Sequence, residues 1–328
     1  MRSLRPGEHG RPGAAGNGRA WFGRRRGDGV LAALPLLLAL LIVCHAAVPN
    51  GPGRLGSLLE TFLPWLGLGL PLLLCVALLR RSGTALYASL VPAAAWFATF
   101  GSLSGPHGGS AHDLVVTQHN VSDENADPQG TARRLLAAEG DLIALEELTP
   151  SLLPEFGAAL EADYPHHASY GTVGLWSKYP LVDERRVDIR PEGLGEDWDR
   201  CLRATARTPH GDVAVYVAHL PSLRLRPTGF GSARRDESAA LLGTAIAAER
   251  LDRVILLGDL NGTVDDRGLA PLTEQLDTPR SGHAFSWPAR FPLARIDQVL
   301  ARSARVSDVR TLPPTGSDHL PIEARVRF

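Results

Sequence analysis

Acidic, amide and imidazole side chains recur directly after short apolar runs in the second part of this sequence. Asn120 follows the run 114–118, and Glu147 follows the run 142–145. A hydrated divalent cation such as Mg²⁺ prefers hard oxygen ligands, typically one or two carboxylates together with water. Taken singly, Asn120 also suits a turn and Glu147 a solvated strand end. The pair therefore indicates a metal site only together with further groups of this kind.

Such groups follow two more apolar runs. His219 ends the run 213–218, and Asp259 and Asn261 share one tight loop directly after the run 254–257. An isolated histidine at a strand end more often only caps the strand, and a Gly-Asp-Leu-Asn-Gly loop is also an ordinary turn. These three residues are candidate site residues only if the other polar groups of the series lie close to them in the fold.

Two aspartates and a histidine complete the series near the C-terminus. Asp297 opens the run 298–301, and Asp318 stands beside His319. An Asp beside a His suits metal coordination or general-base chemistry, and a second carboxylate can orient the imidazole. Except for Asp318 and His319, these groups lie at the ends of predicted strands, where loops extend from a rigid scaffold and sites are usually built.

Short apolar or alternating runs bounded by Gly, Pro or charged residues predict the strands that position these groups. They lie at 114–118, 142–145, 173–177, 213–218, 254–257 and 298–301. Helical spacing predicts helices at 131–139, 150–161 and 234–250. This mixture predicts an α/β (α+β) domain over 113–328, with sheets at the core and helices outside.

The first hundred residues have a different character. Residues 1–29 hold seven Arg with many Gly and Pro, which predicts a disordered basic tail. Three apolar runs follow, each about long enough to cross roughly 30 Å of hydrocarbon. Buried helices, or a cleavable signal peptide for the first run, are the alternatives. Three near-consecutive runs favour transmembrane helices, followed by a linker at 101–112; the helices are expected at about 30–48, 58–79 and 83–100.

The distribution of Arg predicts the orientation of this anchor. Arg24 to Arg26 in the tail and Arg80-Arg81 between the second and third runs mark the cytoplasmic side, because positive residues are retained there. Three crossings then place everything after Phe100 on the other side. We therefore expect a multi-pass cell-membrane protein with a cytoplasmic N-terminus and an extracytoplasmic second part.

The net charge of −1 conceals an asymmetry between the two parts. Residues 1–110 carry ten Arg and three acidic residues, which leaves 24 basic and 32 acidic residues in 111–328, a net charge of −8. An acidic surface forgoes the counterion release that supplies most non-specific affinity for nucleic acid. Duplex DNA is therefore a poor default partner. Three cysteines, two of them in the apolar runs, cannot form a disulfide framework.

The motifs, taken in order, resemble the series of the endonuclease/exonuclease/phosphatase family. The matching blocks are Gln118-His119-Asn120-Val121, Ala144-Leu145-Glu146-Glu147, Ala218-His219-Leu220, Gly258-Asp259-Leu260-Asn261, Arg295-Ile296-Asp297 and Ser317-Asp318-His319-Leu320-Pro321. One departure is Glu146, which stands where the family usually has Gln and makes that position more acidic. The resemblance covers about two thirds of the chain and implies a four-layered α/β sandwich of the DNase I-like type.

The same resemblance implies a metal-dependent hydrolase of phosphoric esters or anhydrides. Glu147 would hold Mg²⁺, or Mn²⁺ in its place, with Asn120 and Asp318 close by and water in the remaining positions. Arg234 and Arg235 stand where many relatives have an Arg, but a solvated charge at a helix end explains them equally well. Neither is assigned to the site.

The resemblance also implies catalytic roles. Asp259 would orient or deprotonate the attacking water, and Asn261 and His219 would hydrogen-bond the non-bridging oxygens. His319, oriented by Asp297, would stabilise the pentacoordinate species or share the role of base. Which of Asp259 and His319 is the base stays open.

A closer similarity is to three-helix membrane proteins of actinobacteria that are associated with teicoplanin resistance. It implies a lipid-linked pyrophosphate as substrate, undecaprenyl pyrophosphate or a related cell-wall lipid intermediate, and the bilayer as a partner. The alternatives are an exported nuclease, a phospholipid phosphodiesterase, or a tethered binding or sensor module without enzyme activity. A module of this last kind is expected to have lost motif residues, and none is missing.

Overall fold

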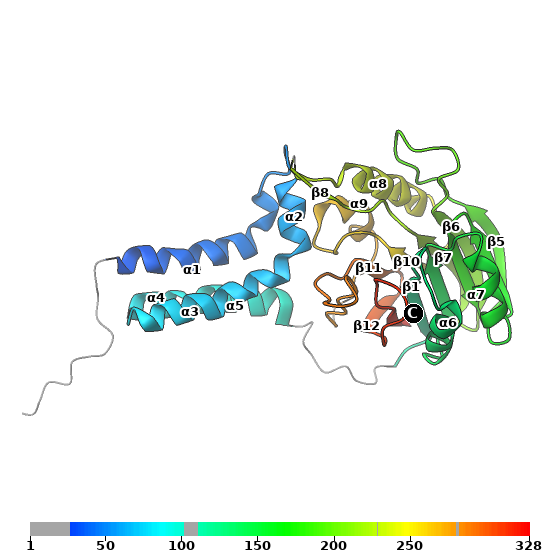
Figure 1. Ribbon diagram of the computed structural model, residues 1–328, viewed down its shortest axis with the longest axis horizontal. Coiled ribbons are helices and arrows are strands. Elements are labelled where there is room, and N and C mark those ends of the chain that lie inside the picture. The colour runs from blue at the N-terminus through cyan, green and yellow to red at the C-terminus, as the bar shows by residue number, and fades with distance from the viewer. Residues whose placement is uncertain (1–26, 102–110, 228, 280–281) are drawn as a thin grey trace, which may run out of the picture.

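The computed structural model describes residues 27–101, 111–227, 229–279 and 282–328. Figure 1 shows a bundle of N-terminal helices that projects from a domain of stacked sheets. The predicted basic tail falls outside the described residues up to position 26, and the predicted linker falls outside them from 102 to 110.

The first sheet has six strands in the order β12-β13-β1-β2-β4-β3. β1 and β2 are parallel, and the other neighbours are antiparallel. Parallel pairing brings the carboxyl ends of β1 and β2 to one edge, where Asn120 lies opposite Glu146. The strands are β1 (Leu114–Asn120), β2 (Leu142–Glu146), β3 (His166–Tyr170), β4 (Val173–Ser177), β12 (Arg305–Thr311) and β13 (Ile322–Arg327).

The second sheet has five strands in the order β11-β10-β7-β6-β5. β7 and β10 are parallel, and β10 pairs with β11 so that Asp259 lies opposite Asp297. Its strands are β5 (Leu181–Arg186), β6 (Cys201–Thr208), β7 (Gly211–Ala218), β10 (Val254–Asp259) and β11 (Asp297–Arg302). A separate short hairpin is formed by β8 (Leu225–Arg226) and β9 (Gly229–Phe230).

Apolar side chains hold the layers together. The inner faces of the two sheets meet through residues such as Val116 and Val215. Leu135 and Phe156 belong to the cluster under the helices of the first sheet, and Leu242 belongs to the one under α8. The outer helices are α6 (Pro128–Leu136), α7 (Leu152–Leu160), α8 (Ala233–Ala247), η4 (Arg267–Leu269) and α9 (Ala270–Thr273). Helix, sheet, sheet and helix form the four layers that the family resemblance implied.

All six predicted strands are present, and so are the three predicted helices of the domain. The strands that the sequence did not predict are more polar. β5 carries four charged residues and is largely exposed at a sheet edge, whereas β6 is buried except for Arg207 although it contains Arg203. The buried Arg203 pairs with Glu249, which lies just beyond α8. The sequence does not predict β6 as a buried strand, because the charge of Arg203 is compensated only in the folded domain.

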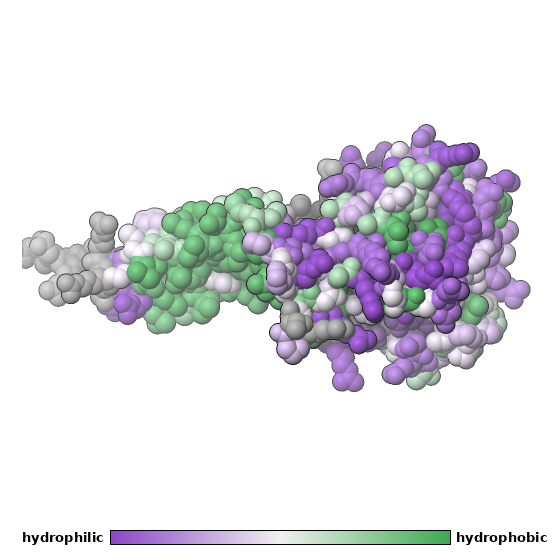
Figure 2. Space-filling view, turned by 90° about the horizontal axis from the view of Figure 1, so that it is seen from above, coloured by the Kyte–Doolittle hydropathy of each residue, from purple (hydrophilic) through white to green (hydrophobic). Residues whose placement is uncertain are grey.

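The N-terminal helices form a bundle with an apolar surface. α1, α3, α4 and α5 lie alongside one another (Figure 1), and Figure 2 shows hydrophobic residues over this bundle and hydrophilic ones over most of the domain. Leu37, Leu72 and Phe97 are each more than half exposed. The elements are α1 (Asp28–Val43), η1 (His45–Ala47), α2 (Leu55–Thr61), η2 (Leu63–Leu68), α3 (Gly69–Leu79), α4 (Gly83–Ala88) and α5 (Leu90–Phe100).

Only one stretch of the described residues, Gly83–Phe100, is by itself long and apolar enough to cross a membrane. The run predicted at 58–79 is broken, because Leu55–Thr61 and Leu63–Leu79 are bent by 73° against each other. Counted as one span, this bent pair is a second candidate. α1 is apolar but has only 16 residues. The expectation of three continuous helices therefore differs from the structure.

Contacts between α2 and the domain explain the break. The guanidinium of Arg267 binds both carboxylate oxygens of Glu60, at 2.7 and 2.9 Å, and also donates to two backbone carbonyls near α2. Arg54 pairs with Asp236 of α8 at 2.8 Å. Glu60 is 1% exposed, so its charge depends on this partner. The first turn of the predicted second run therefore lies on the domain.

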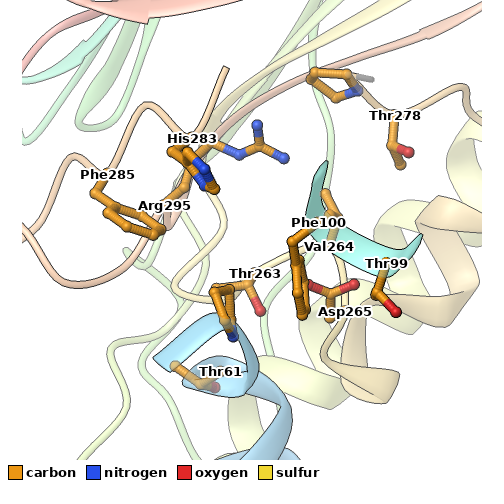
Figure 3. Close-up of a pocket in the computed structure, with 12 residues that line it drawn as sticks. Thr61, Thr99, Phe100, Thr263, Val264, Asp265, Thr278, His283, Phe285 and Arg295 are labelled. Atoms are coloured by element: carbon orange, nitrogen blue, oxygen red, sulfur yellow. The ribbon is translucent and has the colours of Figure 1, made fainter. Parts of the chain in front are cut away.

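Further along the bundle, Trp65 packs on the loop that precedes β11. Its indole donates to the carbonyl of Leu293 at 2.6 Å and stacks on Phe285. A cavity of about 290 Å³ remains at this junction, lined by helical residues such as Phe100 and by Asp265 and other residues of the domain (Figure 3). None of the predicted site residues lines this cavity.

Candidate active site

The two sheets bring the predicted site residues to one end of the sandwich. Asn120 ends β1, and Glu147 directly follows β2. Asp259 ends β10, and its neighbour across the strands, Asp297, begins β11. His219 follows β7, which runs parallel to β10. Since the carboxyl ends of parallel strands meet at one edge, loops distant in sequence become neighbours there.

The side chain of Asn120 lies between two carboxylates. Its Nδ2 atom is 3.1 Å from Oε1 of Glu147 and 3.1 Å from Oδ2 of Asp259. Glu147 has a left-handed backbone with φ 60°, and the backbone N–H of Asp123 donates to its other oxygen at 3.1 Å. Two carboxylates from different sheets therefore converge on one amide group.

His219 completes this side of the cluster. Its Nε2 atom lies 3.7 Å from Oδ2 of Asp259 and 3.8 Å from Oε1 of Glu147. The guanidinium of Arg200 contacts the ring at 3.2 Å from Nδ1. Burial and the neighbouring Arg200 lower the pKa of His219 well below its usual range. The imidazole is therefore neutral at physiological pH.

His319 and Asp297 form a hydrogen-bonded pair on the other side of Asp259. His319 Nδ1 lies 2.8 Å from Asp297 Oδ2, and its Nε2 lies 3.8 Å from Asp259 Oδ2. Gln118 donates to the other oxygen of Asp297 at 3.0 Å. Burial opposes charge on this ring, but Asp297 and Asp259 outweigh it and raise the pKa of His319 to about 10. His319 is therefore a cationic hydrogen-bond donor.

Asp259 occupies the centre of the cluster. The backbone N–H of Asn261 donates to its Oδ1 at 2.9 Å. Burial raises the pKa of Asp259 to about 7 although His319 acts in the opposite direction. The side chain of Asn261 donates to the carbonyl of Leu220 at 2.9 Å, so in this structure it shapes the loop. A role of Asn261 in phosphate binding stays a prediction.

Asp318 differs from the other predicted site residues because its side chain is exposed. Its backbone carbonyl accepts a hydrogen bond from Ala289, and its charge contributes to the raised pKa of the adjacent His319. Ser317 ties this loop to the cluster, since its hydroxyl donates to the carbonyl of Asn120 at 2.7 Å. Asp318 thus lies at the edge of the cluster, and its role as a metal ligand stays a prediction.

Glu146 requires a correction. It is fully buried, and its Oε2 atom accepts a hydrogen bond from Gln118 Nε2 at 2.6 Å. Burial, with the carboxylates of Asp297 and Asp259, raises the pKa of Glu146 well above its usual range. This shift favours the protonated, uncharged form of the side chain. The negative charge expected at this position is therefore weakened by its surroundings.

Arg235 supports the loop that carries Asp259. It is completely buried and donates to the carbonyl of Asn261 at 3.0 Å and to Asp266 at 2.6 Å. The sequence left Arg234 and Arg235 undecided. A signal was present, however, because Arg235 shares one helical face with the buried residues Ala239, Leu242 and Ile246. Gln118 and Arg200 also contact the cluster, and no motif argument assigned them a role.

The donor set fits a divalent cation. Glu147 and Asp259 supply hard carboxylate oxygens, whereas Asn120 turns its amide nitrogen toward them and its Oδ1 accepts a hydrogen bond from the backbone N–H of Ser122. The role of Asn120 as a metal ligand therefore stays a prediction. The ligand atoms of Asp259, Asp297 and His319 also lie within 4.8 Å of one another. On the other side of Asp259, its Oδ2 atom and Oε1 of Glu147 flank the same amide nitrogen, so two carboxylates converge there as well.

Fold and site together define a class of protein: a metal-dependent phosphoester hydrolase built on two stacked mixed sheets. The model of the Endonuclease/Exonuclease/phosphatase family matches residues 117–319, which is more than half of the chain. The chain belongs to this family. The helical bundle lies outside the matched residues. No protein with a curated description matches the chain in sequence.

Solved structures share the fold at low identity. A beta toxin mutant from Staphylococcus aureus with bound magnesium ions is 15% identical, with a TM-score of 0.51, over 65% of this chain and 99% of that one. A mannosyl-6-phosphatase from Bacteroides thetaiotaomicron is 17% identical, with a TM-score of 0.52, over 66% of this chain and 100% of that one. A conserved protein of unknown function from Enterococcus faecalis is 14% identical, with a TM-score of 0.53, over 65% of this chain and 99% of that one. These likenesses show the fold alone.

Proposed function

We propose that this protein is a membrane-anchored, Mg²⁺-dependent phosphohydrolase that acts on undecaprenyl pyrophosphate or a related cell-wall lipid intermediate. The observation that carries the proposal is the attachment of the hydrolase domain to an apolar helical bundle. Arg267 of the domain and Glu60 of α2 fasten the two parts together. A site held in this way meets substrates that reside in a bilayer.

The surface of the bundle supports the membrane assignment. Large apolar side chains of α1, α3 and α5 are exposed to an extent that is unfavourable in water; they include Leu37, Leu40, Leu72, Leu79 and Phe97. The turn between α3 and α4, which contains Arg80-Arg81 in the sequence, and the start of α1 lie at the end of the bundle away from the domain (Figure 1). Because positive residues mark the cytoplasmic side, this arrangement favours a domain outside the cytoplasm.

The metal would be held by Glu147, with Asn120 beside it, Asp318 at the edge and Asp259 close by. A bound Mg²⁺ would act as a Lewis acid that neutralises charge on the transferring phosphoryl group. Mn²⁺ has similar ligand preferences and is expected to replace it. Both ions prefer the oxygen donors that gather here.

The positions of the other side chains indicate their catalytic roles. The hydrogen bond from His319 Nδ1 to Asp297 leaves the Nε2–H group of His319 directed to the side of Asp259. We assign His319 as the donor to a phosphoryl oxygen and Asp259 as the base that orients and deprotonates water. His219 and Asn261 would bind the non-bridging oxygens, which for Asn261 requires release from Leu220.

A resemblance to VanJ, the teicoplanin-resistance protein of actinobacteria, supports the choice of substrate. The shared features are an Arg-rich tail, apolar segments and an exported phosphatase-like domain. On this basis we propose a contribution to glycopeptide resistance as the physiological outcome.

The test compares four substrates with the purified full-length protein in detergent. Phosphate release from undecaprenyl pyrophosphate in the presence of Mg²⁺, abolished by EDTA, is the expected result. Sphingomyelin, a glycerophospholipid and DNA are the parallel substrates. Cleavage of one of these three without phosphate release from the pyrophosphate would replace the proposal with a phosphodiesterase or a nuclease. Absence of any hydrolysis would favour a binding module.

A further inference from the structure

A cavity of about 600 Å³, separate from the one between the bundle and the domain, adjoins the catalytic cluster through Arg200. Four arginines from separate segments of the chain line this arginine cavity: Arg54, Arg200, Arg224 and Arg234. No acidic residue is among its lining residues in the described part of the chain. This concentration of positive charge stands out in a domain whose net charge is −8.

The charges of the cavity are only partly compensated. Arg54 pairs with Asp236, which lies outside the lining. Arg224 and Arg234 are exposed, and no carboxylate of the described residues forms an ion pair with either. Arg200 is attracted by Glu147, Asp259 and Asp123, so the uncompensated charge belongs to Arg224 and Arg234. Like charges repel one another, and a bound anion relieves this repulsion. Charge complementarity therefore points to an anionic ligand.

Arg200 connects the cavity to the cluster. Its Nη1 atom contacts the His219 ring, whose Nε2 lies 3.8 Å from Glu147. Its guanidinium also lies over the ring of Trp198, 5.3 Å from the centroid. A ligand in the cavity is thus a near neighbour of a group at the cluster. The face of Trp198 that Arg200 covers is not free to stack on a nucleic-acid base.

One wall of the cavity comes from outside the family domain. Arg54 and Gly53 precede α2, far before the first matched residue, 117. The carbonyl of Gly53 accepts a hydrogen bond from Phe230 at 2.9 Å. Gly229 has φ 121°, and a Cβ atom there would lie 2.1 Å from Gly53 Cα. Only glycine permits this close approach, so the helical part is built into the cavity wall.

We propose that the arginine cavity binds the second phosphate of a diphosphate substrate while the terminal phosphate occupies the catalytic cluster. This inference rests on the proposed function and narrows its substrate class to pyrophosphate esters. Water attacks the terminal phosphorus and gives a proton to Asp259. The bond from that phosphorus to the bridging oxygen breaks, and the lipid monophosphate leaves with the bridging oxygen. The planar guanidinium groups suit bidentate binding of that phosphate.

The experiment removes two charges from the cavity. The double variant Arg224→Gln/Arg234→Gln changes exposed side chains, so the fold is retained. The matched control, Arg133→Gln/Arg134→Gln, removes two exposed charges from α6. Substrates are undecaprenyl pyrophosphate in detergent, farnesyl pyrophosphate, p-nitrophenyl phosphate as a monophosphate ester, and DNA. Farnesyl pyrophosphate separates recognition of the diphosphate from recognition of the long lipid chain.

We expect kcat/KM for both pyrophosphates to fall about 30-fold or more in the cavity variant, because charged hydrogen bonds to phosphate are lost. The control variant and the p-nitrophenyl phosphate reaction should change by less than about threefold, since neither involves those hydrogen bonds. An equal fall with the monophosphate ester, or in the control variant, would overturn the inference. Loss of DNA cleavage with unchanged pyrophosphate hydrolysis would overturn it in favour of a nucleic-acid site.

Calorimetry of inorganic pyrophosphate binding in the presence of EDTA tests the anion site in the arginine cavity independently of catalysis. Weaker binding to the cavity variant than to the wild type and the control supports the site. Equal binding to all three proteins overturns it. If the wild type hydrolyses none of the substrates, the proposed function fails, and this binding measurement still tests the cavity.

Discussion

Nδ1 of His319 lies 2.8 Å from Oδ2 of Asp297, although Asp297 begins β11 and His319 lies 22 residues further along the chain. The carboxylate fixes the orientation of the ring and raises the pKa of His319 to about 10 against the opposing effect of burial. A second hydrogen bond, from Gln118, holds the carboxylate itself. The pair is therefore a preorganised donor on one side of Asp259.

Replacing Asp297 by Asn should abolish most of the activity while preserving the fold. The amide keeps the shape of the side chain but cannot stabilise the imidazolium, so we expect kcat to fall by about 10³-fold or more. Steady-state kinetics and circular dichroism of the purified variant check both parts of this expectation. A kcat within threefold of the wild-type value would contradict the role of the pair.

Glu147→Gln should weaken metal binding. Loss of one carboxylate from the oxygen cluster should raise the Mg²⁺ concentration for half-maximal activity about 10-fold or more. EDTA should abolish the hydrolytic activity of the wild type, and added Mg²⁺ should restore that activity. The control is Glu155→Gln, which removes an exposed carboxylate from α7. An identical Mg²⁺ dependence in both variants would refute the assignment of Glu147.

Glu146→Gln should be nearly neutral. Burial and the carboxylates of Asp297 and Asp259 raise the pKa of Glu146 and so favour its uncharged form. We expect kcat within about threefold of wild type, since the amide can still accept from Gln118. Glu146→Ala, which leaves that donor unpaired, should cost about 1–3 kcal/mol of stability. A large loss of activity in the Gln variant would mean that Glu146 acts as an anion.

Glu249 predicts a pH dependence of stability. Burial opposes its charge, but hydrogen bonds from Arg203 and Tyr216 prevail and lower the pKa of Glu249 from 4.5 to about 2. Its stabilising contribution is therefore complete above pH 4.5 and is lost as the pH falls towards 2. The Tm difference between wild type and Glu249→Gln should shrink over this range. A difference independent of pH would disprove the linkage.

The ion pair between Glu60 and Arg267 should couple the bundle to the domain. Because Glu60 is buried, Arg267→Met should destabilise the protein by about 3 kcal/mol, close to the effect of breaking a buried pair. A double-mutant cycle with Glu60→Gln, followed by thermal unfolding in detergent, should give a coupling energy of about 1–3 kcal/mol. Additive effects would show that the two parts are held by other contacts.

Local pattern predicted much of the fold. Strands such as β2 and β10 were found because their residues are apolar without interruption and are bounded by charged or turn residues. The polar strands β5 and β6 were not found, since the partner that allows Arg203 to be buried is Glu249. The bend at 58–79 was missed for the same reason, because Glu60 meets Arg267 only in the folded protein.

The sequence by itself determined which groups are available to the site and at which strand ends they lie, because hydrophobic periodicity and turn chemistry are local properties. The tertiary structure alone decided that Glu147 and Asp259 share the amide of Asn120. It also decided that burial and two neighbouring carboxylates raise the pKa of Glu146 and that arginines from separate segments share one cavity. Proton affinity and charge clustering depend on burial and on neighbours across the fold, which the linear order of residues does not contain.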